Sequence, residues 1–184
     1  MANKILDLIK KYGKIIYGKS MDIFEDSPVF FAYKSKDAII IKIKGNANYL
    51  HAPEFDKFLK STLNNYKRYC IMFDECTALD STCLGILAGL LLNLKKVDGV
   101  CFFCGLKPRQ FECIKIVGLD KLAHIINKIS LESSMEELDE INDNNKIGLT
   151  LQLVLEAHRF LLEINARNNI NFKDVVSLLE EKNF

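Results

Sequence analysis

Asp80, Ser81 and Thr82 are the residues of this chain whose types and spacing best suit chemistry on a phosphate. They precede a long apolar run, Cys83 to Leu94, which predicts a helix. Asp80 is placed to cap that helix, and the two hydroxyls would lie in its first turn. Because that turn carries unpaired N–H groups at the positive end of the helix dipole, a phosphate there would be stabilised. Capping alone is the plainer explanation of the same three residues.

A short strand must position this helix start. Cys70 to Phe73 is an apolar run that ends at Asp74, and a short acidic loop leads from there to Asp80. A buried strand that feeds a helix through a short loop is the first half of a βαβ unit.

The run Asp80 to Gly85, DSTCLG, resembles the Asp-Ser-(Ser/Thr)-Gly-Leu-Gly signature of STAS domains of the bacterial anti-sigma factor antagonist type. The resemblance extends over roughly Phe30 to Ile129. It implies an α/β fold in which a small mixed sheet carries helices chiefly on one face. It also implies that Ser81 accepts a phosphate from a partner kinase.

The same resemblance implies roles for the neighbours of Ser81. Thr82 would be a secondary hydroxyl, and Asp74 and Asp80 would shape the loop. Asn48 stands where many antagonists have an aspartate, so it keeps hydrogen bonds but not the charge. Cys83 replaces a glycine and adds bulk beside Ser81; a helix start tends to lower the pKa of a thiol, so its oxidation is an alternative use.

The function implied is that of a cytoplasmic, non-enzymatic phosphoswitch in bacterial partner switching, such as transcription regulation in a stress response. The unphosphorylated form would sequester an anti-sigma factor of the serine-kinase type and release a sigma factor, and a PP2C-type phosphatase would reverse the modification. Two alternatives remain: an interaction scaffold or oligomer-forming regulator with little phosphorylation, and a STAS domain that binds a nucleotide or other small ligand.

Composition and charge narrow the choice of partners. The chain has 184 residues, of which 49% are hydrophobic and 27% charged, with a net charge of +1. This balance gives no reason to expect nucleic acid. The longest apolar run is far shorter than the ~20 residues that span a bilayer, and no secretory signal is visible, so we expect no stable membrane insertion.

Cysteines and histidines offer little catalytic or metal chemistry. Cys101 and Cys104 have C-x-x-C spacing, but the run is strand-like, so the two would point to opposite faces and pack in the core. We expect six free thiols, no metal and no cofactor. The histidines fall in no hydrolase motif, and we expect His158 to be a surface or packing residue and the protein not to be an enzyme.

The expected organisation has four parts: a basic segment 1–27, a STAS domain 28–138, a linker 139–146 and a helical hairpin 147–184. The residues from Ser130 to Asn144 are acidic and suit a solvated helix leading to the linker. The remaining expected elements are listed in chain order: strands Val29–Tyr33 and Ala38–Ile43, a break at Gly45–Asn48, a helix His51–Leu63, a strand Gly99–Gly105, a helix Lys107–Val117 and a strand Ala123–Ile129.

The hairpin is expected to comprise a helix Leu149–Ile164, a turn Asn168–Asn171 and a helix Phe172–Glu180. Its apolar stripes must dock on the domain, on a second copy as a homodimer, or on another partner. Gly85 and Gly89 share one face of the central helix, which predicts close approach of the sheet or a neighbouring helix.

Overall fold

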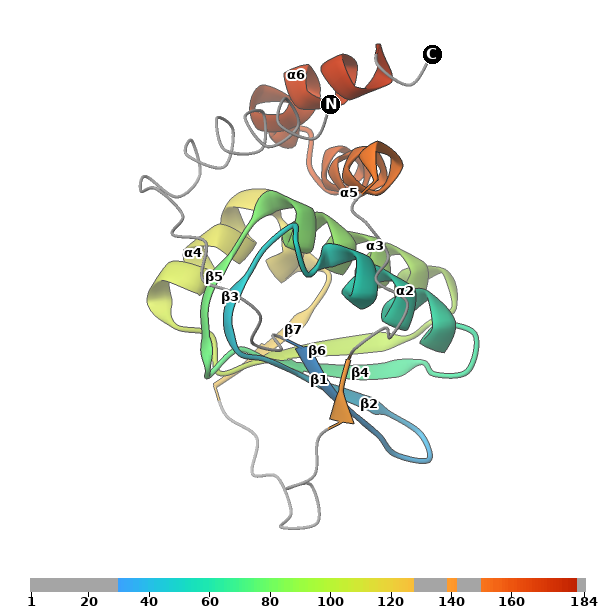
Figure 1. Ribbon diagram of the computed structural model, residues 1–184. Coiled ribbons are helices and arrows are strands. Elements are labelled where there is room, and N and C mark those ends of the chain that lie inside the picture. The colour runs from blue at the N-terminus through green and yellow to red at the C-terminus, as the bar shows by residue number, and fades with distance from the viewer. Residues whose placement is uncertain (1–29, 128–138, 142–149, 182–184) are drawn as a thin grey trace.

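A mixed six-stranded sheet forms the base of the molecule (Figure 1). The computed structural model describes residues 30–127, 139–141 and 150–181. The strands run across the sheet in the order β7 (His124–Ile126), β6 (Val100–Cys104), β4 (Arg68–Met72), β2 (Ile39–Ile43), β1 (Phe30–Lys34) and β8 (Asp139–Glu140). Strands β2, β4, β6 and β7 are parallel to one another, whereas β1 is antiparallel to both β2 and β8.

The sequence patterns explain why these segments pair. β2 is almost wholly buried, as its apolar run predicts for a strand covered on both faces. Ser35 closes the β1–β2 turn, because its hydroxyl accepts from the Ala38 N–H at 3.0 Å. Each parallel connection passes through a helix, as a βαβ crossover requires.

Three helices, α2 (Ala52–Thr62), α3 (Ser81–Lys96) and α4 (Pro108–Val117), lie together on one face of the sheet (Figure 1). α3 is apolar over most of its surface and is buried along most of its length, because the sheet lies on one side and another helix on the other. The rings of Phe30 and Phe55 stack 4.0 Å apart between sheet and α2. The predicted fold class, a small mixed sheet with helices chiefly on one face, is confirmed.

Two short strands replace the break expected at Gly45–Asn48 and the loop expected before Asp80. β3 (Gly45–Ala47) and β5 (Cys76–Leu79) pair in parallel as a separate small sheet. Both expectations were wrong because a strand of three or four residues is too short to show a period in sequence. The pairing brings the residues after β3 next to those after β5.

The C-terminal helices α5 (Leu151–Ile164) and α6 (Asn168–Glu180) form a third layer above α3 (Figure 1). The hairpin therefore docks on its own domain, the first of the three expected arrangements. The turn expected at Asn168–Asn171 was wrong, because these residues begin α6. The Asn168 side chain donates to the carbonyl oxygens of Val117 and Leu161, which holds it inside the fold rather than in a solvent-exposed turn.

Several expectations fall wholly or partly outside the described residues, among them the basic segment 1–27, most of 130–144 and the end of the strand Ala123–Ile129. At Asp139–Glu140 the expected solvated helix was wrong, since these residues pair with β1. The domain and linker boundaries stay predictions. No helix in the described ranges is long and apolar enough to cross a bilayer.

Candidate functional site

Asp80 caps α3 and ties its start to the neighbouring β3 corner. One carboxylate oxygen accepts the Cys83 N–H at 2.8 Å, and the other accepts the Tyr49 N–H at 2.6 Å. The side chain is only 2% exposed. Burial raises the pKa of Asp80 to about 6, although the two N–H donors act in the opposite direction. The predicted helix cap is confirmed, and it also fixes the loop that follows β3.

Ser81, the first residue of α3, lies against a histidine of α5. Its Oγ is 3.1 Å from His158 Nε2, and His158 Nδ1 is 2.7 Å from the Val154 carbonyl oxygen. A carbonyl oxygen can only accept, so the proton of a neutral imidazole lies on Nδ1. His158 Nε2 therefore accepts the hydrogen bond that the Ser81 hydroxyl donates. Burial lowers the pKa of His158, which favours this neutral form.

His158 is the site residue that sequence reasoning missed. The expectation of a surface or packing residue was incomplete, because the side chain is 2% exposed and bonds to Ser81. A signal was present: Val154, Ala157, His158 and Leu161 fall at helical spacing on the apolar stripe of α5. What the sequence could not give was the partner, which lies 77 residues earlier.

Thr82, Cys83 and Asn48 surround the same helix start, and all three are buried. Thr82 Oγ1 finds no hydrogen-bond partner in the described part of the chain. Cys83 Sγ lies 3.5 Å from the Asn48 carbonyl oxygen, and the Asn48 side chain accepts the Leu50 N–H at 2.9 Å. The structure thus brings Asn48 beside the Ser81 turn, as the resemblance implied.

The alternative use of Cys83, as an oxidation-sensitive thiol with a lowered pKa, is contradicted. Burial raises the pKa of Cys83 well above its ordinary value, and the nearby Asp80 carboxylate raises it further. A thiol that is fully buried beside a carboxylate stays protonated and is a poor target for oxidation.

Asp74 lies apart from the other predicted site residues. It occupies the exposed turn between β4 and β5, so the whole of β5 separates it from Asp80. Its Cβ and backbone lie near Gly105, at the end of β6. A direct part in the Ser81 site stays a prediction.

Gly85 and Gly89 let α5 approach α3 closely. A Cβ on Gly85 would overlap the Ala157 carbonyl group, and one on Gly89 would lie 2.7 Å from the Phe160 ring. The predicted use of these glycines, close approach of a neighbouring helix, is confirmed. It is this approach that brings His158 onto Ser81.

The serine–histidine pair lacks the other parts of a nucleophilic site. His158 Nδ1 bonds a backbone carbonyl rather than a carboxylate, and Ser81 is only 4% exposed. The described residues hold no cluster suited to a metal ion. The six cysteines are free and buried, and Cys101 and Cys104 lie on opposite faces of the sheet, as predicted.

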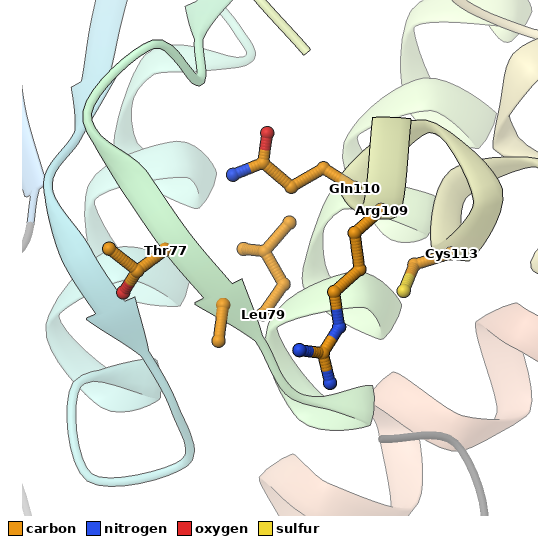
Figure 2. Close-up of a pocket in the computed structure, with 6 residues that line it drawn as sticks. Thr77, Leu79, Arg109, Gln110 and Cys113 are labelled. Atoms are coloured by element: carbon orange, nitrogen blue, oxygen red, sulfur yellow. The ribbon is translucent and has the colours of Figure 1, made fainter. Parts of the chain in front are cut away.

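Figure 2 shows a pocket in another place, between β5 and α4. It is lined by Thr77, Ala78, Leu79, Arg109, Gln110 and Cys113. Its enclosed space would hold only about one water molecule, far less than a nucleotide needs. This pocket gives no support to the small-ligand alternative.

Comparison with known proteins supports the fold. Residues 31–131 match the family model of the STAS domain. The solution structure of TM1081 is 20% identical, covers 65% of this chain and 94% of its own, and has a TM-score of 0.50. The crystal structure of that protein, a candidate anti-sigma factor antagonist from Thermotoga maritima, is 19% identical with the same TM-score and covers 58% and 92%.

A third similar structure is the unphosphorylated anti-sigma factor antagonist SpoIIAA. It is 12% identical, covers 54% of this chain and 89% of its own, and has a TM-score of 0.48. The comparison with curated proteins found no match. These structures are covered over 89–94% of their own length, whereas the matches take up 54–65% of this chain.

Proposed function

Because the chain belongs to the STAS domain family, we propose that it is a bacterial anti-sigma factor antagonist whose partner binding is switched by phosphorylation of Ser81. Unphosphorylated, it binds an anti-sigma factor of the serine-kinase type in the cytoplasm and so releases a sigma factor. The kinase transfers phosphate from ATP to Ser81, and a PP2C-type phosphatase removes it. The protein itself catalyses no reaction in this scheme.

One observation carries the proposal: the Ser81 hydroxyl stands at the first residue of a long helix that Asp80 caps. The positive end of the α3 dipole can accommodate a phosphate without unfolding the helix. The modification adds about −1.5 to −2 charges. A partner surface shaped for a hydroxyl would have to desolvate that charge, so binding would weaken.

Incubation with a serine-kinase anti-sigma factor and ATP, followed by intact mass, tests the proposal. Ser81→Ala should bind the kinase but gain no phosphate. Ser81→Asp should bind at least ~10-fold more weakly, which corresponds to about 1.4 kcal/mol. Thr82→Ala is the matched control and should take up phosphate as the parent does. Full phosphorylation of Ser81→Ala would refute the assignment.

A second candidate is an interaction scaffold that is seldom phosphorylated. The 4% exposure of Ser81 beneath α5 favours this candidate. It predicts that the parent protein gains no mass with kinase and ATP. It also predicts that the parent protein and the Ser81→Asp variant bind the partner with equal affinity. The two candidates therefore give opposite results in the same assay.

A further inference from the structure

We propose that the α5–α6 hairpin is a reversible cover over Ser81, and that hairpin docking and Ser81 phosphorylation exclude one another. The covering itself follows from contacts within this chain. The consequence for phosphorylation rests on the proposed function, since Ser81 is the acceptor there. A kinase would then act only on molecules whose hairpin has left α3.

Geometry leaves no route to the Ser81 hydroxyl while α5 is docked. Ser81 is 4% exposed, and the His158 ring nitrogen is 3.1 Å from Oγ. Phosphoryl transfer needs the reacting atoms about 3–3.5 Å apart and in line. The histidine occupies that space, so the donor phosphate cannot approach.

Charge explains why a phosphate on Ser81 would in turn prevent the hairpin from docking. A phosphate on Ser81 would add three oxygens where the structure has a single hydrogen bond to a buried, neutral imidazole. The adjacent Asp80 is also buried, so the new charge would stand beside a carboxyl group. Burying an anion without room or water is costly, and release of α5 relieves that cost. By linkage, docking of the hairpin disfavours the phosphorylated state by the same factor as phosphorylation weakens docking.

The hairpin has contacts of its own that would hold it together after release. Its two helices share a hydrophobic cluster, to which the described part of the domain contributes Tyr49 alone. The hairpin members of the cluster are Val154, Leu155, Val175, Val176 and Leu179. Arg159 of α5 also pairs with Glu180 of α6 at 2.7 Å. These contacts join α5 to α6 and not to α3, so the pair can move as a unit.

The two glycines of α3 provide matched variants. At Gly85 an added methyl group would meet the Ala157 backbone, which cannot move aside unless the whole helix does. At Gly89 it would meet the Phe160 ring, which is only half-buried and can rotate away. Alanine favours a helix over glycine at both positions. Gly85→Ala should therefore displace the hairpin while keeping α3 intact, whereas Gly89→Ala should leave it docked.

Reaction of an introduced thiol with N-ethylmaleimide measures the covering directly. Ser81→Cys would be made in the full chain alone, with Gly85→Ala and with Gly89→Ala, and peptide mass spectrometry would separate position 81 from the six natural cysteines. Labelling at this position should be slow in the parent background. It should be at least ~10-fold faster with Gly85→Ala and within about threefold of the parent with Gly89→Ala; tenfold corresponds to about 1.4 kcal/mol in the opening equilibrium.

Equal, fast labelling in all three backgrounds would overturn the covering. If circular dichroism shows that Gly85→Ala does not fold, Ala157→Arg replaces it, because that substitution disrupts the same contact from the side of α5. Gln152→Arg, an exposed position on the same helix, is then its control. Labelling that Ala157→Arg does not accelerate would overturn the covering equally.

A phosphorylation assay distinguishes the covering of Ser81 by the hairpin from the proposed phosphoswitch function. With a serine-kinase anti-sigma factor and ATP, Gly85→Ala with Ser81 intact should gain phosphate at least ~10-fold faster than Gly89→Ala. Equal rates would overturn the exclusion while leaving Ser81 as the acceptor. If neither protein gains phosphate but labelling differs as expected, the covering stands and the proposed function fails.

Discussion

At the scale of single residues, three polar side chains are buried at the start of α3, and Ser81 is the one that bonds to α5. Asp80 receives two backbone N–H bonds, and Ser81 bonds to His158, whereas Thr82 Oγ1 has no partner in the described part of the chain. A buried hydroxyl without a partner costs free energy. The start of α3 thus combines close packing with incomplete polar pairing.

Asp80→Ala should lower the free energy of unfolding at pH 7 by about 2 kcal/mol, because it removes a cap and strands the Tyr49 N–H. The folded-state pKa of about 6 lies above the ordinary value of 3.8 that applies in the unfolded chain. The parent's free energy of unfolding therefore rises as the pH falls from about 6 towards 4. The loss of unfolding free energy caused by Asp80→Ala should grow over the same range. Urea unfolding at several pH values measures it.

Asp37→Ala is the control for Asp80. Asp37 is an exposed acid whose ion pair with Arg68 lies at the surface, so the loss should stay below about 1 kcal/mol. A cost at Asp80 that shrinks as the pH is lowered would contradict the raised pKa.

Acid should loosen the hairpin through His158. Its pKa in the folded protein lies below the ordinary value of 6.5, so the unfolded or undocked state binds the proton more readily. The stability that neutral His158 contributes is present above pH 6.5 and is lost as the pH falls. Hydrogen exchange of α5 peptides, corrected for the intrinsic effect of pH, should therefore accelerate between pH 7.5 and 5.5.

Two variants isolate the titration of His158. His158→Gln cannot be protonated, so its α5 exchange should no longer respond to this pH change. His124→Gln alters an exposed histidine on β7 and should keep the parent's response. A response that disappears in both variants, or in neither, would count against His158 as the titrating group.

At the scale of elements, the hairpin is attached to more than one helix of the domain. α5 lies on α3 through Gly85 and Gly89, and the start of α6 is bonded to the end of α4. Asn168 makes this second attachment, donating to Val117 O at 3.0 Å and to Leu161 O at 2.7 Å. The second attachment joins the hairpin to α4 and not to α3, so it can act as the pivot when α5 moves.

Asn168→Ala should lower the free energy of unfolding by about 2 kcal/mol, since it leaves two buried carbonyl groups without their donor. Asn169→Ala is the matched control: its exposed amide donates to the nearby Ala166 carbonyl oxygen, so the loss should be below about 0.5 kcal/mol. Thermal and urea unfolding measure both. Equal losses would show that the amide of Asn168 has no special part in attaching α6.

At the scale of the whole molecule, the protein is a STAS domain with a third layer added. The sheet and the helices α2, α3 and α4 form the first two layers, and the hairpin covers the outer side of α3 (Figure 1). Because the hairpin also contributes Leu153, Ala157, Leu161 and Phe172 to the main core, its docking buries apolar surface of both parts.

Deleting residues 148–184 should therefore expose an apolar face of α3 and lower solubility or change the oligomeric state. Sedimentation and melting temperature compare the truncated and full chains. A variant with unchanged sedimentation and melting temperature would show that the hairpin is not structurally attached.

The sequence by itself determined the elements whose signals are local. The apolar runs of β2, β4 and β6, the Asp80 cap and the stripe of α5 each depend on neighbours within a few residues. The Asp80–Gly85 motif indicates the family, and the family implies the arrangement of the sheet. The spacing of Gly85 and Gly89 predicted that another element approaches this face of α3 closely, but it did not distinguish the sheet from a neighbouring helix.

Only the tertiary structure decided the contacts between distant segments. β3 and β5 are strands because they pair with each other, and Asn168 begins a helix because its amide meets Val117 O. His158 is buried and neutral because α5 lies on Ser81, 77 residues away. Such contacts depend on which surfaces meet when the chain folds, and no local period or propensity records that choice.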